Sequence, residues 1–475
     1  MWKKYNTLSI ETKASLWAFV ASIVQKGVTI LATPIFTRIL TTEEYAQYGL
    51  YQSWQDLLII VSSLCVYNYA TYTAMLKFDK DREGFITSAQ TLITSLSLFC
   101  FAIYIILYLI FGELTGFPLY IMVLMFIDII CLSSFNLWKA KERCLFHYRL
   151  MTVLSLIIGI CGPIMGILAV KMTNYSGYGR IYGIILVNVL VGLGIYLYNI
   201  HLSKRFFVKK YWRYIFTYCI PLIPHFFASQ ILSRIDRIMI NDMCGASQTG
   251  IYTLAFSLSM LMLFVNDAIF TSLTPWTYQK IKENKKDEIK KVANLVVILV
   301  AMCNLILVLL APEAVKIFAP QEYYEAIYII PAVSTSVFFI FLFNLFANIE
   351  YYYAKTKLVA IASISAAIVK VGLNYIFIDI YGYMAAGYTT MISYMLFAIG
   401  HFILMQYVSK KCADGYQFYD NKTIFIISIV FVAISILIIP IYQLTIIRYI
   451  LIILLIFFVI YKRNNIKKII LYKKT

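Results

Sequence analysis

Runs of about 18 to 25 mostly apolar residues recur along this chain, the length that carries an α-helix across a hydrocarbon core of roughly 30 Å. A backbone in lipid must satisfy its own hydrogen bonds, and runs of this length fit helices rather than barrel strands. Only 13% of the residues are charged, against roughly 25% in soluble domains. We therefore predict an all-α polytopic membrane protein with about 14 transmembrane helices.

The loops between these runs are short, and none is long enough to fold as a separate catalytic domain. Any function must therefore lie among the helices. The expected spans cover residues 15–37, 45–75, 85–111, 118–137, 150–170, 180–201, 214–241, 250–273, 291–311, 326–350, 357–380, 383–407, 423–441 and 445–461.

The formal net charge of +18 would suggest nucleic-acid binding in a soluble protein, but here the basic residues follow the topology. Most of the 41 Lys and Arg residues fall in alternate loops, which are cytoplasmic by the positive-inside rule. Both termini are predicted to be cytoplasmic, and no nucleic-acid partner is expected. Five basic residues fall on the outer side: Arg38, Lys171, Arg180, Lys316 and Arg448.

A weak internal repeat indicates two halves. The stretch 47–51, Gln-Tyr-Gly-Leu-Tyr, recurs at 248–252 as Gln-Thr-Gly-Ile-Tyr, and Tyr178, Gly179 and Gly183 recur as Tyr381, Gly382 and Gly387. We predict an N-terminal six-helix bundle over 1–210, a C-terminal six-helix bundle over 211–411, and two additional helices with a basic cytoplasmic tail over 412–475. Halves of six spans enter from the same side, so we expect pseudo-two-fold symmetry around a central cavity.

Four basic residues fall within spans: Lys26, Arg234, Arg237 and Lys370. Ionisable groups in a bilayer cost roughly 2.5 to 3.5 kcal/mol even on lenient scales, so they usually face a protein interior or water. Arg234 and Arg237 share one helix face with Gln230 and Asn241, and Lys26 shares a face with Thr29 and Thr33. We predict that the four cations line the cavity and bind an anionic cargo.

Other polar residues are expected to line the same cavity: Gln52, Asn344, Asn348 and Asn374. The alternative is that Arg234 or Arg237 pairs with Asp236, Asp267 or Asp56 simply to fix the packing of helices. Pro34 is expected to bend the first span, and Pro221 and Pro224 are expected to bend the span that carries Arg234. No histidine or cysteine pair has ligand spacing, so we predict no metal and no cofactor.

Several motifs together resemble those of bacterial oligosaccharide flippases of the Wzx type, in the multidrug, oligosaccharidyl-lipid and polysaccharide exporter (MOP) superfamily. The resemblance extends over nearly the whole chain and is most specific at the start of the seventh span. The motifs are Pro-Leu-Ile-Pro at 221–224, Ser-Arg-Ile-Asp-Arg at 233–237, Ala-Pro-Glu at 311–313, Glu-Tyr-Tyr-Glu-Ala at 322–326 and Tyr-Tyr-Ala-Lys-Thr-Lys at 352–357.

The resemblance implies a flippase of the bacterial cytoplasmic membrane. Its cargo would be undecaprenyl-diphosphate-linked oligosaccharide for O-antigen, capsule or a similar polysaccharide, moved to the outer leaflet by alternating access. Lys26, Arg234, Arg237 and Lys370 would hold the diphosphate or acidic sugars. Asp56 and Asp267 would couple transport to a proton or sodium gradient. Membrane lipid, a polysaccharide polymerase and chain-length machinery would be partners.

The resemblance also leaves open a close relative, the flippase of the lipid-linked peptidoglycan precursor, which has fourteen spans and a cationic cavity; the motif of the seventh span favours the polysaccharide branch. Two other classes stay open as well. An ion-coupled drug antiporter of the same superfamily would share the core helices, but it should carry acidic rather than basic cavity residues. A membrane polysaccharide polymerase or glycosyltransferase would need catalytic carboxylates or a large external loop, whereas the longest loops here are rich in Lys. The chain is therefore not expected to be an enzyme.

The topology predicts that position 246, between the seventh and eighth spans, faces the outside. In a background without the native cysteines, Ala246→Cys should react with a membrane-impermeant thiol reagent added to intact cells. Labelling that occurs only after lysis would overturn the predicted orientation.

Overall fold

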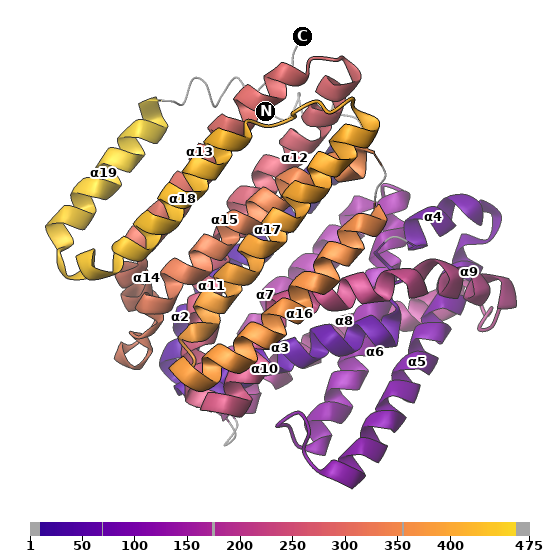
Figure 1. Ribbon diagram of the computed structural model, residues 1–475. Helices are drawn as coiled ribbons and strands as arrows, with labels where there is room; N and C mark the ends of the chain where they lie inside the picture. The colour runs from indigo at the N-terminus through magenta and orange to yellow at the C-terminus, as the bar shows by residue number, and fades with distance from the viewer. Residues whose placement is uncertain (1–9, 69, 173–175, 354–355, 462–475) are drawn as a thin grey trace, which may run out of the picture. The chain divides into compact units, whose positions relative to one another are not determined.

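α-Helices make up almost the whole of the computed structural model, which describes residues 10–68, 70–172, 176–353 and 356–461 (Figure 1). No β-strand occurs in these ranges, so the all-α prediction is confirmed. The expected basic tail and the Ala354-Lys355 part of one motif lie outside the described residues. The chain divides into two units, unit 1 (Met1–Gln230) and unit 2 (Ile231–Thr475). The predicted boundaries after residues 210 and 411 stay predictions.

Unit 1 holds the first helices and the beginning of α10, a helix that continues into unit 2. Its elements are α2 (Ile10–Ile39), α3 (Thr42–Ser63), α4 (Ala70–Lys77), η1 (Asp79–Asp81), α5 (Arg82–Phe111), α6 (Leu119–Cys144), α7 (Tyr148–Met172), α8 (Ser176–Leu202), α9 (Lys209–Cys219), η2 (Ile220–Leu222) and α10 (Ile223–Cys244).

Unit 2 holds most of α10 and all that follows. Its further elements are α11 (Ala246–Ser259), α12 (Met262–Lys282), α13 (Lys286–Leu309), α14 (Ala311–Phe318), η3 (Gln321–Tyr323), α15 (Ala326–Tyr352), α16 (Thr356–Tyr381), α17 (Ala385–Cys412), α18 (Asn421–Leu437), η4 (Ile439–Gln443) and α19 (Thr445–Tyr461).

In the described ranges, 11 helical segments are long and apolar enough to cross a membrane, and two shorter apolar helices, Asn421–Leu437 and Thr445–Phe457, follow them. These segments correspond to all of the expected spans except the second, 45–75. The structure divides that region into α3 and α4. The expected total of about 14 is therefore close, but the second span is not one continuous helix.

The break after α3 has a local cause. Leu64 and Cys65 adopt left-handed conformations with φ of 50° and 49°, which ends the helix at Ser63. The backbone N–H of Cys65 then donates to the Ser63 hydroxyl at 3.2 Å, and the Thr71 hydroxyl donates to the Val66 carbonyl at 2.9 Å. Nearby hydroxyls thus satisfy backbone groups that the broken helix leaves without partners.

The seventh span is divided as well. α9 ends at Cys219, a short 3-10 turn containing Pro221 follows, and α10 begins at Ile223. Pro221 and Pro224 lack the backbone N–H that a continuous helix would use, so the predicted distortion is confirmed. Pro34, in contrast, lies inside the continuous helix α2.

One helix forms the centre of each unit. In unit 1, α6 packs against α5 and α8, and α8 packs closely against α7. A side chain at Gly183 of α8 would lie 2.1 Å from the backbone nitrogen of Gly166 in α7, so only glycine permits this approach. In unit 2, α15 packs against α11, α13 and α17. Of the apolar stretch of α15, 89% is buried, a larger fraction than in the other described candidate spans.

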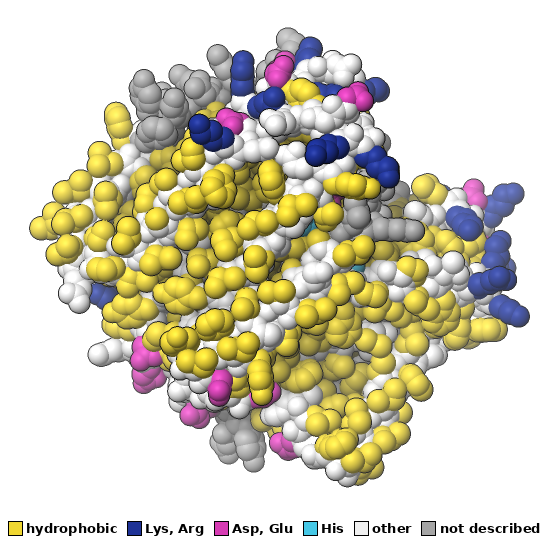
Figure 2. Space-filling view, in the orientation of Figure 1, with side chains coloured by type: hydrophobic (Ala, Val, Ile, Leu, Met, Phe, Trp, Pro, Cys, Tyr) yellow, Lys and Arg dark blue, Asp and Glu magenta, His cyan; other side chains and the backbone are white. Residues whose placement is uncertain are grey.

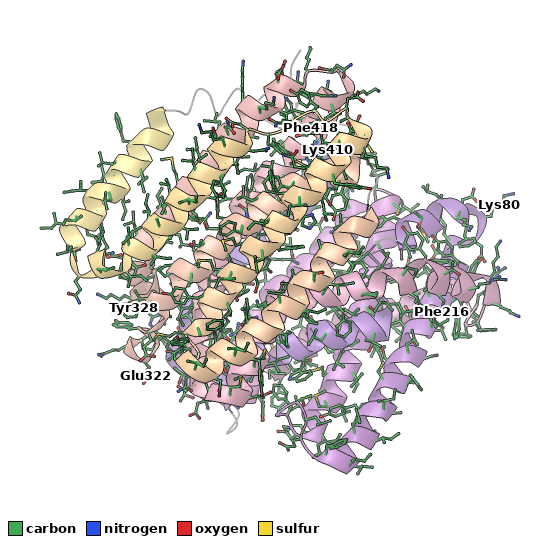
Figure 3. The ribbon with its side chains drawn as sticks, viewed as in Figure 1. Lys80, Phe216, Glu322, Tyr328, Lys410 and Phe418 are labelled. Carbon is green, nitrogen blue, oxygen red and sulfur yellow. The ribbon has the colours of Figure 1, made fainter. Side chains whose placement is uncertain are left out.

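Hydrophobic side chains extend along the visible lengths of the helices, and Lys and Arg gather near their ends (Figure 2). This distribution is the one a lipid-facing surface requires. Within unit 2, Glu322 and Tyr328 lie at one end of the helices, and Lys410 and Phe418 lie at the other (Figure 3). The acidic loop before α15 and the basic end of α17 are therefore on opposite faces of this unit.

An ion pair anchors the C-terminal helices. Arg448 in the first turn of α19 forms two hydrogen bonds with the Glu313 carboxylate of α14, at 2.6 and 2.7 Å, and a third with the Leu309 carbonyl at 2.9 Å. Arg448 is 3% exposed. The Ala-Pro-Glu motif thus supplies a helix start at Pro312 and a carboxylate that holds α19.

Arg448→Ala should destabilise the purified protein by about 2 kcal/mol, because it removes a bidentate charged hydrogen bond and leaves the Glu313 carboxylate without its cation. The midpoint of thermal unfolding in detergent measures the effect. Lys316→Ala, at an exposed position on the same short helix, is the matched control and should have little effect. Equal shifts in the two variants would contradict this role of the ion pair.

Candidate functional site

A buried carboxylate in unit 2 collects side chains from four helices. Asp236 of α10 is 1% exposed, and its Oδ2 atom lies 2.7 Å from the Lys370 ammonium of α16. The Tyr252 hydroxyl of α11 donates to the same oxygen at 2.8 Å, and the Thr390 hydroxyl of α17 donates to it at 3.1 Å. The other oxygen, Oδ1, accepts from the Asn374 amide of α16 at 2.7 Å. We call this group the Asp236 centre.

The Lys370 ammonium is fully buried, and its hydrogen bonds are made within this centre and to the neighbouring backbone of α10. Besides the Asp236 carboxylate, it donates a hydrogen bond to the Leu232 carbonyl one turn earlier in α10. A charge removed from water requires both a counter-ion and satisfied hydrogen bonds, and Lys370 has them. In the conformation described here, its charge is neutralised within unit 2.

The network continues beyond the ion pair. Asn374 lies one turn after Lys370 on α16, so both side chains reach Asp236 from one helix face. The Asn374 carbonyl oxygen accepts a hydrogen bond from the Thr389 hydroxyl of α17. Polar groups in a dry interior are costly unless each has a partner, and this chain of bonds supplies partners across α10, α16 and α17.

Arg237 and Arg234, on the same helix, have different surroundings. Arg237 is 3% exposed, and its guanidinium carbon lies 4.5 Å from the centre of the Phe256 ring on α11, a cation–π geometry. Arg234 is half-buried, as are Gln230 and Asn241. Lys370 supplies an ammonium group to the Asp236 carboxylate at 2.7 Å. The alternative in which Arg234 or Arg237 serves helix packing stays a prediction.

Unit 1 contains a second buried carboxylate. Asp128 of α6 is 1% exposed, and its Oδ2 atom accepts hydrogen bonds from the Gln55 amide at 2.7 Å and the Tyr51 hydroxyl at 3.1 Å. The side chain of Asn188 on α8 also reaches this carboxylate. In the part of unit 1 that the structure describes, no Lys or Arg forms an ion pair with Asp128. We call this group the Asp128 centre.

The sequence repeat links the two centres through their tyrosines. Tyr51 and Tyr252 end the repeated stretches 47–51 and 248–252, and each donates its hydroxyl to a buried aspartate. The aspartates, however, come from different helices, α6 in unit 1 and α10 in unit 2. Repetition has thus preserved the donor but not the acceptor or its cation.

The predicted residues of the first spans lie in unit 1. Lys26 and Thr29 on α2 are exposed, whereas Thr33 is buried. The Thr29 hydroxyl donates to the Gln25 carbonyl at 3.0 Å, and the Thr33 hydroxyl donates to the Thr29 carbonyl at 2.9 Å. These threonines therefore satisfy their hydrogen-bonding groups within their own helix.

The remaining predicted residues are spread along the helices. The Gln52 amide donates to the Tyr48 hydroxyl at 2.8 Å, and Asp56 is half-buried nearby on α3. In unit 2, the Asn344 amide donates to the Ile340 carbonyl at 2.9 Å, Asn348 is buried and Asp267 is exposed. Of the residues predicted to bind the cargo or to line the cavity, the structure thus brings together Lys370 and Asn374 at Asp236. The cavity between the halves stays a prediction.

Sequence reasoning did not select Asp128, Tyr51 or Tyr252, and it considered Asp236 only as a partner of arginine. A usable signal was present for each. Asp128 is the only acidic residue in the expected span 118–137, and both tyrosines belong to the repeat. A buried acid in lipid demands donors, and the repeated tyrosines are suitable donors.

Comparison with known proteins places this architecture in a family. The profile described as polysaccharide biosynthesis protein matches residues 12–279, which is more than half of the chain. The chain belongs to the polysaccharide biosynthesis protein family. A second profile, MatE, matches residues 221–376 of this family member. The resemblance to polysaccharide exporters of the MOP superfamily is thereby confirmed.

A curated relative and two solved structures extend the comparison. The family member is 25% identical over 205 residues to "Lsg locus putative protein 1" of Haemophilus influenzae, covering 40% of this chain and 50% of that protein. It thus spans half the length of that relative. The lipid II flippase MurJ in an inward closed conformation superposes with a TM-score of 0.70 at 16% identity, covering 96% of this chain and 100% of that one.

A MATE family multidrug resistance transporter of the MOP superfamily, in an inward-facing conformation, superposes with a TM-score of 0.64 at 15% identity. That alignment covers 83% of this chain and 99% of the transporter. At such identities the likeness concerns the fold, which is that of a MOP-superfamily transporter. Family and fold both agree with the prediction of a membrane transporter and not an enzyme.

A double-mutant cycle tests whether Lys370 serves Asp236. Lys370→Met and Asp236→Asn should each destabilise the protein by roughly 3–5 kcal/mol, because each leaves one buried charge without its partner. The double variant has no charge to compensate, so it should recover much of this loss. Thermal unfolding of the four purified proteins in detergent gives the coupling. Strictly additive losses would contradict the pairing and would favour a cargo role for Lys370.

Proposed function

We propose that this protein is a flippase that moves polyprenyl-diphosphate-linked oligosaccharides from the cytoplasmic to the outer leaflet of the bacterial cytoplasmic membrane. The family match is the observation that carries the proposal, because it ties the MOP transporter fold to polysaccharide biosynthesis. One of the solved structures with this fold is a lipid II flippase, as its name states, and it supports a lipid cargo.

Basic side chains within apolar helices fit this cargo. Lys26 is exposed and Arg234 is half-buried, so a diphosphate can reach both. Arginine offers a planar fork of donors for phosphate oxygens, and lysine offers a compact charge. We assign Lys26, Arg234 and Arg237 to the cargo, whereas Lys370 acts on it only through the Asp236 centre. Coupling to a proton or sodium gradient through Asp56 and Asp267 belongs to the same proposal.

The orientation also belongs to this proposal. Both termini are cytoplasmic, and the Lys410 end of unit 2 faces the cytoplasm. A polysaccharide polymerase and chain-length machinery would act on the cargo once it reaches the outer leaflet. Transport alternates between inward and outward openings, as in the inward-facing and outward-facing conformations known for this fold.

A drug antiporter is the second candidate, because the MatE profile matches residues 221–376. Such an antiporter for cationic compounds requires accessible acidic groups in its cavity. Asp236 is instead neutralised by Lys370, and the accessible charges at Lys26 and Arg234 are basic. These charges favour an anionic cargo.

Deletion of the gene in its host should cause lipid-linked oligosaccharide to accumulate on the cytoplasmic leaflet. A membrane-impermeant glycan-modifying enzyme applied to right-side-out and inverted vesicles measures the leaflet. Lys26→Ala and Arg234→Ala should restore less than a tenth of wild-type export while the protein remains in the membrane, because each removes an anion partner.

Lys410→Ala is the matched control, since this exposed lysine lies at a helix end and should leave export unchanged. Normal leaflet distribution after deletion would contradict the flippase. Unpolymerised glycan on the outside would instead identify a polymerase. Loss of resistance to cationic drugs with normal glycan would identify an antiporter.

A further inference from the structure

Unit 1 contains a polar cavity that is separate from both aspartate centres. Its volume is about 440 Å³, within the range of small-molecule sites. It lies between the segment that follows the break after α3 and the last turns of α6. We call it the Lys139–Arg143 pocket, and its lining residues are Tyr67, Asn68, Tyr72, Asn136, Lys139, Ala140 and Arg143.

Two positive charges line this pocket without acidic partners. Lys139 and Arg143 are one turn apart on α6, and in the described part of the chain neither forms an ion pair. Lys141, between them, faces elsewhere: its ammonium lies 3.0 Å from Glu83 and 3.3 Å from Glu142. Like charges at this spacing repel each other, so the pocket is electrostatically incomplete without an anion.

The lining side chains add donors of the kind that bind phosphate. Asn68 and Asn136 carry amides that form no side-chain hydrogen bond within the residues described. Tyr67 and Tyr72, from the segment after the break and from α4, also line the pocket. Arg, Lys, Asn and Tyr together form the donor set that proteins use for phosphate oxygens.

The helix break places these donors. Left-handed Leu64 and Cys65 turn the chain out of α3, so that Tyr67 and Asn68 approach α6. The Tyr67 phenol is itself tied to the Ser63 hydroxyl at the break, which fixes this ring at the wall of the pocket beside Asn68. Interrupted helices in membrane proteins commonly border a polar cavity.

We propose that the Lys139–Arg143 pocket binds the phosphate groups of a lipid head group. The pocket lies beside the last turns of the candidate span Leu119–Cys144, at the end of this helix that carries its basic residues. Basic pockets between membrane helices are a recognised type of head-group site. Assignment of that lipid as the diphosphate carrier of the cargo rests on the proposed flippase function; an anionic phospholipid of the bilayer presents the same chemistry.

A simpler reading is that both cations reach outward to the membrane surface, as basic side chains near helix ends often do. Arg143 is exposed, as that reading requires, but Lys139 is half-buried and lies 5.2 Å from the Phe135 ring. Snorkelling also gives no reason for Asn68 and Asn136 to line the same cavity as these two cations.

The test uses the full-length protein purified in an uncharged detergent and titrated calorimetrically with three probes: inorganic pyrophosphate, farnesyl diphosphate and short-chain phosphatidylglycerol. Farnesol, which has no phosphate, is the negative probe. Lys139→Gln with Arg143→Gln should weaken binding of the phosphate probes at least tenfold. Arg149→Gln, an exposed cation at the start of α7, is the matched control and should bind as wild type.

The single variant Arg143→Gln changes an exposed side chain, so it should fold normally even where the double variant does not. It should still weaken binding of the phosphate probes severalfold. Preference for farnesyl diphosphate identifies the carrier lipid, and equal binding of phosphatidylglycerol identifies a bilayer lipid; both support the pocket. Absence of binding, or equal affinity in the double variant and in Arg149→Gln, overturns it. Binding is measured on purified protein, so a failed leaflet assay would refute the flippase while leaving the head-group site intact.

Discussion

A buried carboxylate and a buried ammonium 2.7 Å apart connect four helices of unit 2. The Asp236 carboxylate of α10 accepts hydrogen bonds from Lys370 and Asn374 of α16, Tyr252 of α11 and Thr390 of α17. One side chain therefore links α10 to three other helices. In lipid there is no solvent to replace a lost partner. The position of each helix in this group is therefore tied to that of the others, and Arg234, two residues before Asp236 on α10, is positioned with them.

The two units solve the same problem in different ways. In unit 2 the buried Asp236 is paired with the lysine side chain of Lys370. In the described part of unit 1, Asp128 is surrounded by the neutral hydrogen-bond donors Tyr51, Gln55 and Asn188. Neutral donors stabilise a carboxylate less than a counter-ion does. Equivalent tyrosines thus serve one centre that contains a cation and one that, within the described residues, does not.

The sequence was sufficient for the helices but not for their interruptions or partners. Apolar length predicted nearly every span, and Pro221 and Pro224 predicted the break before α10. The break after α3 could not be predicted, because Leu64 and Cys65 adopt left-handed conformations that neither residue type favours. The pairing of Lys370 with Asp236 joins positions far apart in sequence, and the sequence predicted only that Lys370 faces the protein interior. Lys139 and Arg143 were counted as ordinary loop-side charges, since their pocket depends on the unforeseen break.

The C-terminal hairpin has a mechanical consequence. Helices α18 and α19 pack against α13, and Arg448 clamps α19 to α14, so the hairpin is attached to unit 2. A fluorophore or spin label on the exposed face of α19, for example at Ile453, would therefore follow unit 2 as a rigid handle. Paired with a second label at an exposed site on α5, such as Leu109, it offers a ruler for the relative motion of the units during a transport cycle.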